Sequence, residues 1–356
     1  MDNRKNIISL SNLALIIATG FIILLLWQLK SLLVVLMIVI IIASTLAPII
    51  NRADKLNIPR WLAVFLVYLG LIIILIGVGL MIGPTVFEQL EKLIKKFPFY
   101  VEVLQEITAN LVMRLGMSEP GLIDKINQVF DIQGLVSWLF RSSQELLIRS
   151  YSFTRGIIGG IFTFVLAILL SGYMLSDSDN LINSIVNLFP HPWNERLKLQ
   201  VKPVSQKMGG YIQGRILVSA ILGVAITIGL KFLGISELAL GLGVIAGFTN
   251  LIPFFGPVLG SILPLLVAIS QGGWTFFSVF LLFLIIQNIE TYVLDPLLVG
   301  SSVKINPLYQ LLAVLGGAQL LGILGALIVP PWVAGTSVLI NKLYLEPKLL
   351  AENAEK

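Results

Sequence analysis

The sequence has 356 residues, of which 57% are hydrophobic and only 12% are charged. Soluble globular chains carry about 25% charged residues, so we expect most of this chain to be shielded from water. The net charge of +5 is not gathered into a basic face of the kind that binds nucleic acid. With no cysteine and one histidine, His191 between two prolines, disulfides, thiolate metal sites and cysteine nucleophiles are excluded.

The N-terminal part predicts three membrane spans, because a spanning helix needs about 20 mainly apolar residues. The first is expected at Ile8–Leu29, and it is too long for the apolar core of a signal peptide. A tight turn at Lys30 and Ser31 leads into a second span that ends at Ile50. A third runs over Trp61–Ile82 and stops at Gly83-Pro84. Residues 1–84 are therefore expected to form an N-terminal three-span membrane unit.

Residues 85–155 differ in character, because their charges balance and their apolar residues are periodic rather than continuous. Spacings of three and four residues mark one helical stripe. Its first part comprises Phe87, Leu90, Leu93, Ile94 and Phe97. We expect a small extracytoplasmic helical region here, or one that lies against the membrane surface.

The remainder, residues 156–346, is expected to be a transport membrane domain, followed by a cytoplasmic tail at 347–356. Its elements are predicted as a span at Gly156–Leu175, a polar loop at Ser176–Lys207, a span at Met208–Leu233, and three apolar blocks at Leu238–Ile269, Trp274–Leu294 and Leu308–Ile340. The fold class is thus an all-α integral membrane protein of about eight membrane segments. Two of them, 238–270 and 308–340, are broken or re-entrant helical hairpins.

The distribution of basic residues predicts the orientation. With the N-terminus inside, the two basic loops 51–60 and 176–207 both lie on the cytoplasmic side. The opposite orientation would export both. Both termini are therefore expected in the cytoplasm.

The first broken block carries the most informative residues. Hydrocarbon cannot hydrogen-bond free backbone groups, so non-helical backbone at membrane depth must be buried in protein or line a cavity. Two prolines and a glycine disfavour a continuous helix here. The candidate site residues in this block are Thr249, Asn250, Pro253, Phe254, Gly256 and Pro257. Two half-length helices that meet at the break are the economical solution, as a re-entrant hairpin or as one discontinuous span. A proline-kinked helix without a functional role is the alternative.

The second broken block exceeds one span and contributes Gly316, Gly317 and Gln319, with Gly322, Gly325 and Pro330-Pro331 further along. Small residues also let membrane helices approach closely, so simple packing is an alternative explanation here.

A polar cluster ends the apolar block between these two. Gln287, Glu290 and Thr291 share one helical face, with Asn288 nearby. Asp295-Pro296 is expected to end the helix. An ionisable residue inside a span is a functional hypothesis by default. We expect a translocation or coupling role for Glu290, with a position near the lipid headgroups as the alternative.

Motifs of other function classes are absent from the sequence. It contains no P-loop, no H-E-x-x-H and no G-x-S-x-G motif. We therefore expect no enzyme activity, no cofactor and no metal site.

The C-terminal residues resemble the autoinducer-2 exporter family of bacterial membrane proteins. The similarity lies in the runs Asn250–Pro257, Gln287 with Glu290, Asp295–Gly300, Asn306–Leu308 and Gly316-Gly317 to Ala326. The wider pattern covers nearly the whole chain, but the N-terminal half matches mainly in layout. Asn306 departs from the family pattern, which leads us to expect histidine before Pro307.

The resemblance implies a carrier in the bacterial cytoplasmic membrane that exports a small polar metabolite or signalling molecule. It also implies an elevator-like movement of a broken-helix unit, and self-association, with a pentamer as one form. The rival hypotheses are a sodium/proton antiporter, in which Glu290 and Asp295 handle cations, and a membrane scaffold without transport.

Overall fold

The computed structural model describes residues 19–21, 24–25, 28–114, 150–300 and 306–354. All secondary structure in these ranges is helical, which confirms the predicted all-α class. The elements are α2 Lys30–Asp54, α3 Arg60–Arg114, α6 Ser150–Ser176, α7 Ser178–Val186, α8 Trp193–Phe232, α9 Ala239–Thr249, α10 Phe255–Ser270, α11 Gly273–Ile289, the π-helix η1 Glu290–Gly300, α12 Pro307–Ile340, the π-helix η2 Asn341–Leu345 and α13 Glu346–Ala354.

Five of the described helices are long and apolar enough to cross a membrane. They lie at Lys30–Ala53, Arg60–Leu104, Trp193–Phe232, Gly273–Gly300 and Pro307–Asn353. Three shorter apolar helices accompany them, at Phe162–Ser176, Ala239–Thr249 and Phe255–Ser270. The first predicted span lies mostly outside the described residues, and the predicted number of about eight segments stays a prediction.

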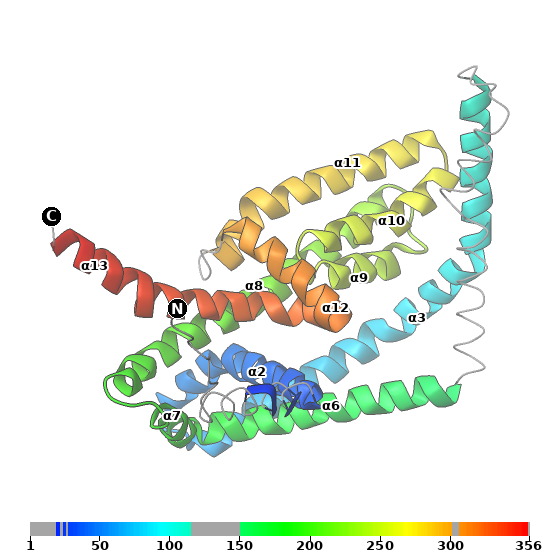
Figure 1. Cartoon of the computed structure of the whole chain (residues 1–356). Helices are drawn as coiled ribbons and strands as arrows, with labels where there is room; N and C mark the ends of the chain where they lie inside the picture. Colours follow the sequence, from blue (N-terminus) through cyan, green and yellow to red (C-terminus); the bar gives the residue numbers. More distant parts are fainter. Residues whose placement is uncertain (1–18, 22–23, 26–27, 115–149, 301–305, 355–356) are drawn as a thin grey trace, which may run out of the picture.

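Four segments that were expected to be helix ends, a loop or a turn are helical in the structure, and the predicted membrane boundaries stay predictions. The helix α3 does not stop at Gly83-Pro84 but runs through both Pro84 and Pro98 to Arg114. Figure 1 shows it bending before its final turns, as expected where proline removes a helical hydrogen bond. The expected extramembrane region therefore begins as a continuation of this helix, and residues 115–149 lie outside the described part.

The predicted polar loop 176–207 is also largely helical, because it contains α7 and the first turns of α8. Pro203 lies inside α8 without ending it. At the other end, Asp295-Pro296 does not end a helix either, since η1 continues to Gly300.

The tight turn predicted at Lys30 and Ser31 is likewise not formed. The N–H of Leu29 donates to the carbonyl of Leu25 at 2.9 Å, and that of Leu33 donates to the carbonyl of Leu29 at 3.0 Å. Helical hydrogen bonding therefore crosses this point into α2.

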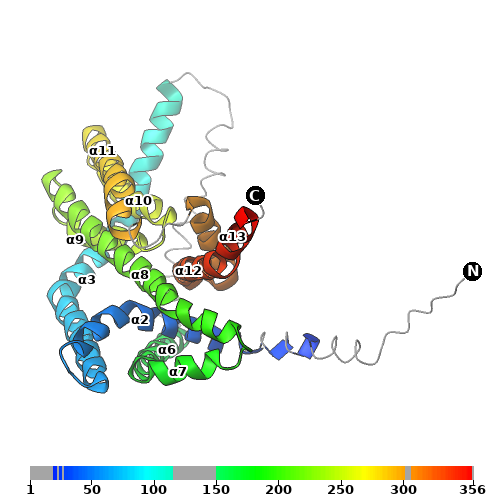
Figure 2. The same ribbon diagram turned by 90° about the vertical axis from the view of Figure 1, so that its left-hand side faces the viewer.

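The long helix α8 organises the packing, with α9, α10 and α11 on one side of it and α2 and α6 on the other (Figures 1 and 2). The main apolar cluster joins α8 to α9, α10, α11 and η1, and α3 contributes Leu93 and Tyr100. A second cluster joins α2, α3 and α6 through residues such as Ile50, Ala63 and Leu175. The candidate site lies within the first cluster.

Glycines allow α8 and α9 to cross at close range. A Cβ on Gly247 would lie 3.1 Å from the Cα of Gly223 and 2.9 Å from the carbonyl oxygen of Ser219. Small residues are the usual means of close approach between membrane helices. This crossing holds the end of α9 against the middle of α8.

Both predicted broken blocks are broken in the structure. Asn250 follows α9 and Phe254 precedes α10, with φ of +66° at Phe254. In α12 the backbone leaves helical geometry at Gly322, where φ is +66° and ψ is −152°. A Cβ on Gly317 would collide with the carbonyl of Gly325, so the two halves of α12 fold back on each other.

The extended helix α3 is tied to the start of α9 by a side chain. The amide oxygen of Gln89 accepts a hydrogen bond from the N–H of Gly241 at 2.6 Å. This N–H belongs to the first turn of α9, where donors have no partner inside the helix. A nearby ion pair, Lys96 with Glu237 at 3.5 Å, joins the same two segments.

The contact between Gln89 and Gly241 can be tested by cross-linking, because the chain has no cysteine. A Cβ on Gly241 would lie 3.1 Å from the Cβ of Gln89, close to the roughly 3.5–4.5 Å of disulfides. We expect Gln89→Cys/Gly241→Cys to form a disulfide under mild oxidation, measured by mass spectrometry of unreduced peptides. Each single-cysteine variant is the control. Two thiols that stay reactive toward maleimide after oxidation would contradict this packing of α3 on α9.

Candidate functional site

The centre of the candidate site is Arg215, which projects from the middle of α8 and is 4% exposed. Sequence reasoning missed this residue, although an arginine well inside the expected span Met208–Leu233 is itself a signal. Charged side chains within membrane helices are rare and face the protein interior or a water-filled cavity. Arg215 does face the interior.

Three polar side chains from two other segments surround the Arg215 guanidinium. Its Nη1 donates to Oε1 of Glu290 at 3.0 Å and to Oδ1 of Asp295 at 3.3 Å. Its Nη2 donates to Oδ1 of Asn250 at 3.4 Å. The amide Nδ2 of Asn250 then donates to Oε1 of Glu290 at 3.0 Å, which closes the ring of contacts. We call Arg215, Asn250, Glu290 and Asp295 the charge cluster.

The broken block supplies Asn250 to the cluster. The helix α9 ends at Thr249, and the Asn250 side chain points back to α8 and η1. Asn250 as a whole is only 2% exposed. Gly256 allows the turn, because a Cβ there would collide with the carbonyl of Thr249. The turn is closed by a hydrogen bond from Gly256 N–H to the carbonyl of Ile252 at 2.8 Å. The unwound backbone thus delivers one amide side chain to the charges.

The π-helix η1 explains how two carboxylates reach the same arginine. In an α-helix, residues five apart point about 140° away from each other, given 3.6 residues per turn. A π-helix bonds i to i+5 and is commonly found at functional sites. Glu290 and Asp295 are five apart within η1, and both contact Nη1 of Arg215. Sequence periodicity assumed an α-helix here, so it grouped Glu290 with Gln287 and Thr291 and expected the helix to end at Asp295.

Gly214 brings η1 close to α8. A Cβ at this position would collide with the carbonyl oxygen of Leu298, so only glycine lets the two backbones approach this far. Since Gly214 precedes Arg215, the same approach sets the arginine beside the carboxylates.

Two buried polar atoms in this part of the structure have no hydrogen-bond partner among the described residues. They are Nε of Arg215 and Oγ of Ser219, one helical turn apart on α8. Buried polar groups are normally satisfied, so each is available to a solute or a water molecule.

A cavity of about 20 Å³ lies next to the cluster and is lined by Asn250, Gln287, Glu290 and Pro257. It has room for about one water molecule. The site is therefore closed to anything larger in this conformation.

The structure brings together only some of the predicted site residues. Asn250, Glu290 and Asp295 meet at Arg215, while Gln287 and Pro257 line the adjoining cavity. Glu290, at 3% exposed, lies inside the protein, whereas Asp295 is half-buried.

Other predicted residues near the cluster bond locally instead. Thr249 donates to the carbonyl of Ala246 at 3.0 Å, and Asn288 donates to that of Leu284 at 2.7 Å. Thr291 is exposed and accepts from Gln287 at 3.3 Å. Pro253 is buried in the turn, while Phe254 and Pro296 are exposed.

The α12 residues lie apart from the cluster. Gly317 packs against the opposite half of α12, and Gln319 is exposed. Gly316 is half-buried, and a Cβ there would meet nothing within 4 Å. Asn306 caps α12, because its side-chain oxygen accepts from the N–H of Leu308 at 2.9 Å.

The charge cluster combines one basic side chain with two acidic ones and an amide. Within the described residues, no group of three or more histidine and acidic side chains is placed to hold a metal ion. One guanidinium faces two carboxylates, so the formal charges leave one negative charge in the cluster.

These features define an α-helical, multi-pass membrane protein with an ionisable cluster enclosed between its helices, as transporters have. A family model described as "AI-2E family transporter" matches residues 14–344. The chain therefore belongs to the AI-2E transporter family, which confirms the resemblance found in its sequence.

Curated relatives carry names of the same kind. The chain is 27% identical to "Putative transport protein YrrI" of Bacillus subtilis (strain 168) over 333 residues, which cover 90% of each chain. It is also 27% identical to "Putative transport protein YueF" of the same organism, over 80% of this chain and 76% of the relative. The likeness to "Putative permease PerM" of Escherichia coli (strain K12) is 27% over 76% of each chain.

Replacing Arg215 tests whether the cluster is a buried ion pair. Arg215→Leu leaves the Glu290 charge buried without its partner, which costs about 3–5 kcal/mol of folding free energy. We expect a clear fall in the melting temperature of the purified protein in detergent. The melting temperature of Arg215→Leu/Glu290→Leu should fall less than that of Arg215→Leu alone, because neither charge of the buried pair remains.

The matched control is Lys95→Leu, which breaks the exposed pair with Glu91 and should change the melting temperature little. Losses that simply add in the double variant would show that Arg215 and Glu290 do not interact.

Proposed function

We propose that this protein is a secondary carrier that moves a small polar solute past the charge cluster. The observation that supports this most is the burial of Arg215 and Glu290, 4% and 3% exposed, within an otherwise apolar helix packing. Replacing a buried ion pair by apolar residues is often neutral or stabilising. A scaffold would therefore gain nothing from these charges, whereas a carrier needs them to bind a solute that leaves water.

The closed cavity supports a carrier that moves. A space of about 20 Å³ cannot hold a metabolite, so Asn250 and the turn that holds it would have to separate from Glu290 to admit one. We propose an alternating-access, elevator-like movement in which the α9–α10 hairpin shifts relative to α3.

The negative charge left in the cluster supports coupling to a cation. Because two carboxylates face one guanidinium, a proton or a sodium ion would neutralise the site. This observation also favours a second candidate function, a sodium/proton antiporter, in which the cation is itself the substrate.

The placement of basic segments supports an orientation with both termini in the cytoplasm. Arg60 ends the basic segment 51–60 and donates to the carbonyl of Leu175 at 2.9 Å and to Ser178 at 2.7 Å. The two basic segments 51–60 and 176–207 therefore meet at one end of the molecule, as the positive-inside rule requires. We propose the bacterial cytoplasmic membrane as the location.

Two parts of the proposal rest on the family resemblance alone. One is the export direction, for a small polar metabolite or signalling molecule. The other is self-association, for which we propose a homo-oligomer with a pentamer as one form.

Transport by proteoliposomes tests the role of the cluster. We load vesicles with a bacterial polar-metabolite extract and follow efflux by mass spectrometry, with and without sodium and pH gradients. Asn250→Ala and Glu290→Gln should each lower the flux of every transported solute at least tenfold, because the first removes a hydrogen bond to Arg215 and the second removes the negative charge that Arg215 faces.

Gln271→Ala is the matched control for this assay, because Gln271 is an exposed amide at the end of α10 and is not among the candidate site residues. Unchanged flux in both cluster variants would remove these residues from the mechanism. Sodium-dependent proton movement without any organic efflux would favour the antiporter over the exporter.

The proposed movement can be tested by locking α9 to α3. Oxidation of Gln89→Cys/Gly241→Cys should stop flux, and dithiothreitol should restore it. A Val64→Cys/Gly172→Cys pair is the control, since a Cβ on Gly172 would lie 3.7 Å from Cγ1 of Val64 within the packing of α3 on α6. Full flux in the cross-linked Gln89→Cys/Gly241→Cys protein would contradict movement of the hairpin relative to α3.

A further inference from the structure

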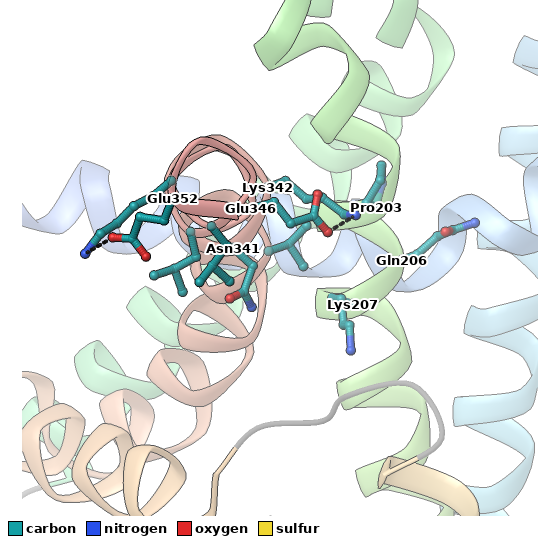
Figure 3. A pocket seen from close by; sticks show the side chains of 11 residues that line it. Pro203, Gln206, Lys207, Asn341, Lys342, Glu346 and Glu352 are labelled. Carbon is teal, nitrogen blue, oxygen red and sulfur yellow. Dashed lines mark hydrogen bonds and ion pairs between the residues drawn. The ribbon is translucent and has the colours of Figure 1, made fainter. Parts of the chain in front are cut away.

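A large groove lies away from the charge cluster, between α8 and the C-terminal segment made of the end of α12, η2 and α13. Its volume is about 800 Å³. Figure 3 shows Lys342 and Glu346 on the side of the C-terminal segment that faces α8, and Lys207 of α8 beside the same space. The transport proposal leaves this groove without a role.

The groove lies where two separate helices change from apolar to polar. In α8, charged residues are frequent before Met208 and rare after it. In α12, no charged residue occurs from Pro307 to Ile340, and Lys342 is the first to follow. Such boundaries coincide with the membrane–water interface. Because both boundaries meet at this groove, the groove lies at the level of the lipid headgroups.

The lining has an apolar part and a charged part, which are complementary to the acyl chains and the headgroup of a phospholipid. Val338, Leu345 and Leu349 are apolar, while three lysines and two glutamates supply a formal excess of one positive charge. Two of the lysines, Lys342 and Lys348, make ion pairs with the glutamates one turn later, at 2.6 and 3.6 Å. All four of these side chains are about half exposed. Exposed pairs of this kind are weak, so an incoming phosphate can compete for the lysines.

We propose that this groove binds an anionic phospholipid, with its phosphodiester at Lys207, Lys342 and Lys348 and its acyl chains along the apolar wall. Basic pockets between membrane helices on the cytoplasmic side are suited to such headgroups. One net positive charge matches the single negative charge of a phosphatidylglycerol phosphodiester. The apolar wall favours a lipid over a free phosphate ion, which has nothing to place against Leu345 and Leu349.

Bound lipid would join α8 to the C-terminal segment. The helix α8 carries Arg215 further along its length, but binding at the groove does not depend on transport. The proposal can therefore be tested on its own, and it stands or falls separately from the proposed function.

The test measures lipid binding to the purified full chain in a neutral detergent. Phosphatidylglycerol and phosphatidylcholine with identical acyl chains are titrated separately. Binding is followed by native mass spectrometry, and thermal unfolding by the fluorescence of the six tryptophans. We expect phosphatidylglycerol to bind and to raise the melting temperature, and phosphatidylcholine to do neither at the same concentration.

Lys342→Gln/Lys348→Gln should weaken phosphatidylglycerol binding about 25-fold, at roughly fivefold for each lysine near an anionic lipid. The matched control is Lys92→Gln/Lys95→Gln, which removes the same charge from two equivalent ion pairs on α3 and should bind like the unmodified protein. Equal binding by the unmodified protein and Lys342→Gln/Lys348→Gln, or equal losses in both double variants, would overturn the proposal. Displacement of the lipid by millimolar inorganic phosphate would overturn it in favour of a free-anion site.

Discussion

The arrangement of the candidate site depends on one buried ion pair, between Arg215 and Glu290. Their atoms lie 3.0 Å apart, and each side chain is 4% exposed. A charge in this position is costly unless it is paired and hydrogen-bonded. Three features of the backbone meet that requirement: the unwound end of α9 brings Asn250, the π-helix brings Asp295 alongside Glu290, and Gly214 lets η1 approach α8. The irregular backbone thus occurs at the positions that bring hydrogen-bond partners to the buried charges.

This dependence links the fold to the proposed transport. Asn250 belongs to the α9–α10 hairpin, whereas Arg215 lies in the long helix α8 and Glu290 begins η1, which continues α11. A hairpin that moves away from the ion pair would expose the pair to a solute without unfolding any helix. The contact between Gln89 and Gly241 ties this same hairpin to α3, so the long N-terminal helix is in a position to follow or restrain it.

The sequence predicted part of the fold and part of the candidate site, and the difference between the correct and the incorrect predictions has physical reasons. Pro253, Gly256 and Pro257 in an apolar run predicted the break and the burial of Asn250, because backbone propensity is local. Pro84 and Pro296 were wrongly expected to end helices, since tertiary packing keeps a helix continuous despite a lost hydrogen bond. The π-helix and the partner of Glu290 could not be read from periodicity, because both depend on how α8 packs against η1. Arg215 itself is visible in the sequence as a charge inside the predicted span Met208–Leu233.

A structure determined by electron cryomicroscopy in lipid nanodiscs tests the central claim most directly. The account predicts a break between α9 and α10 at Asn250–Phe254, with Asn250 and Arg215 within hydrogen-bonding distance of Glu290 and no acyl-chain density against them in at least one state. A continuous helix through this segment, or Glu290 among the lipid headgroups and far from Arg215, would contradict it.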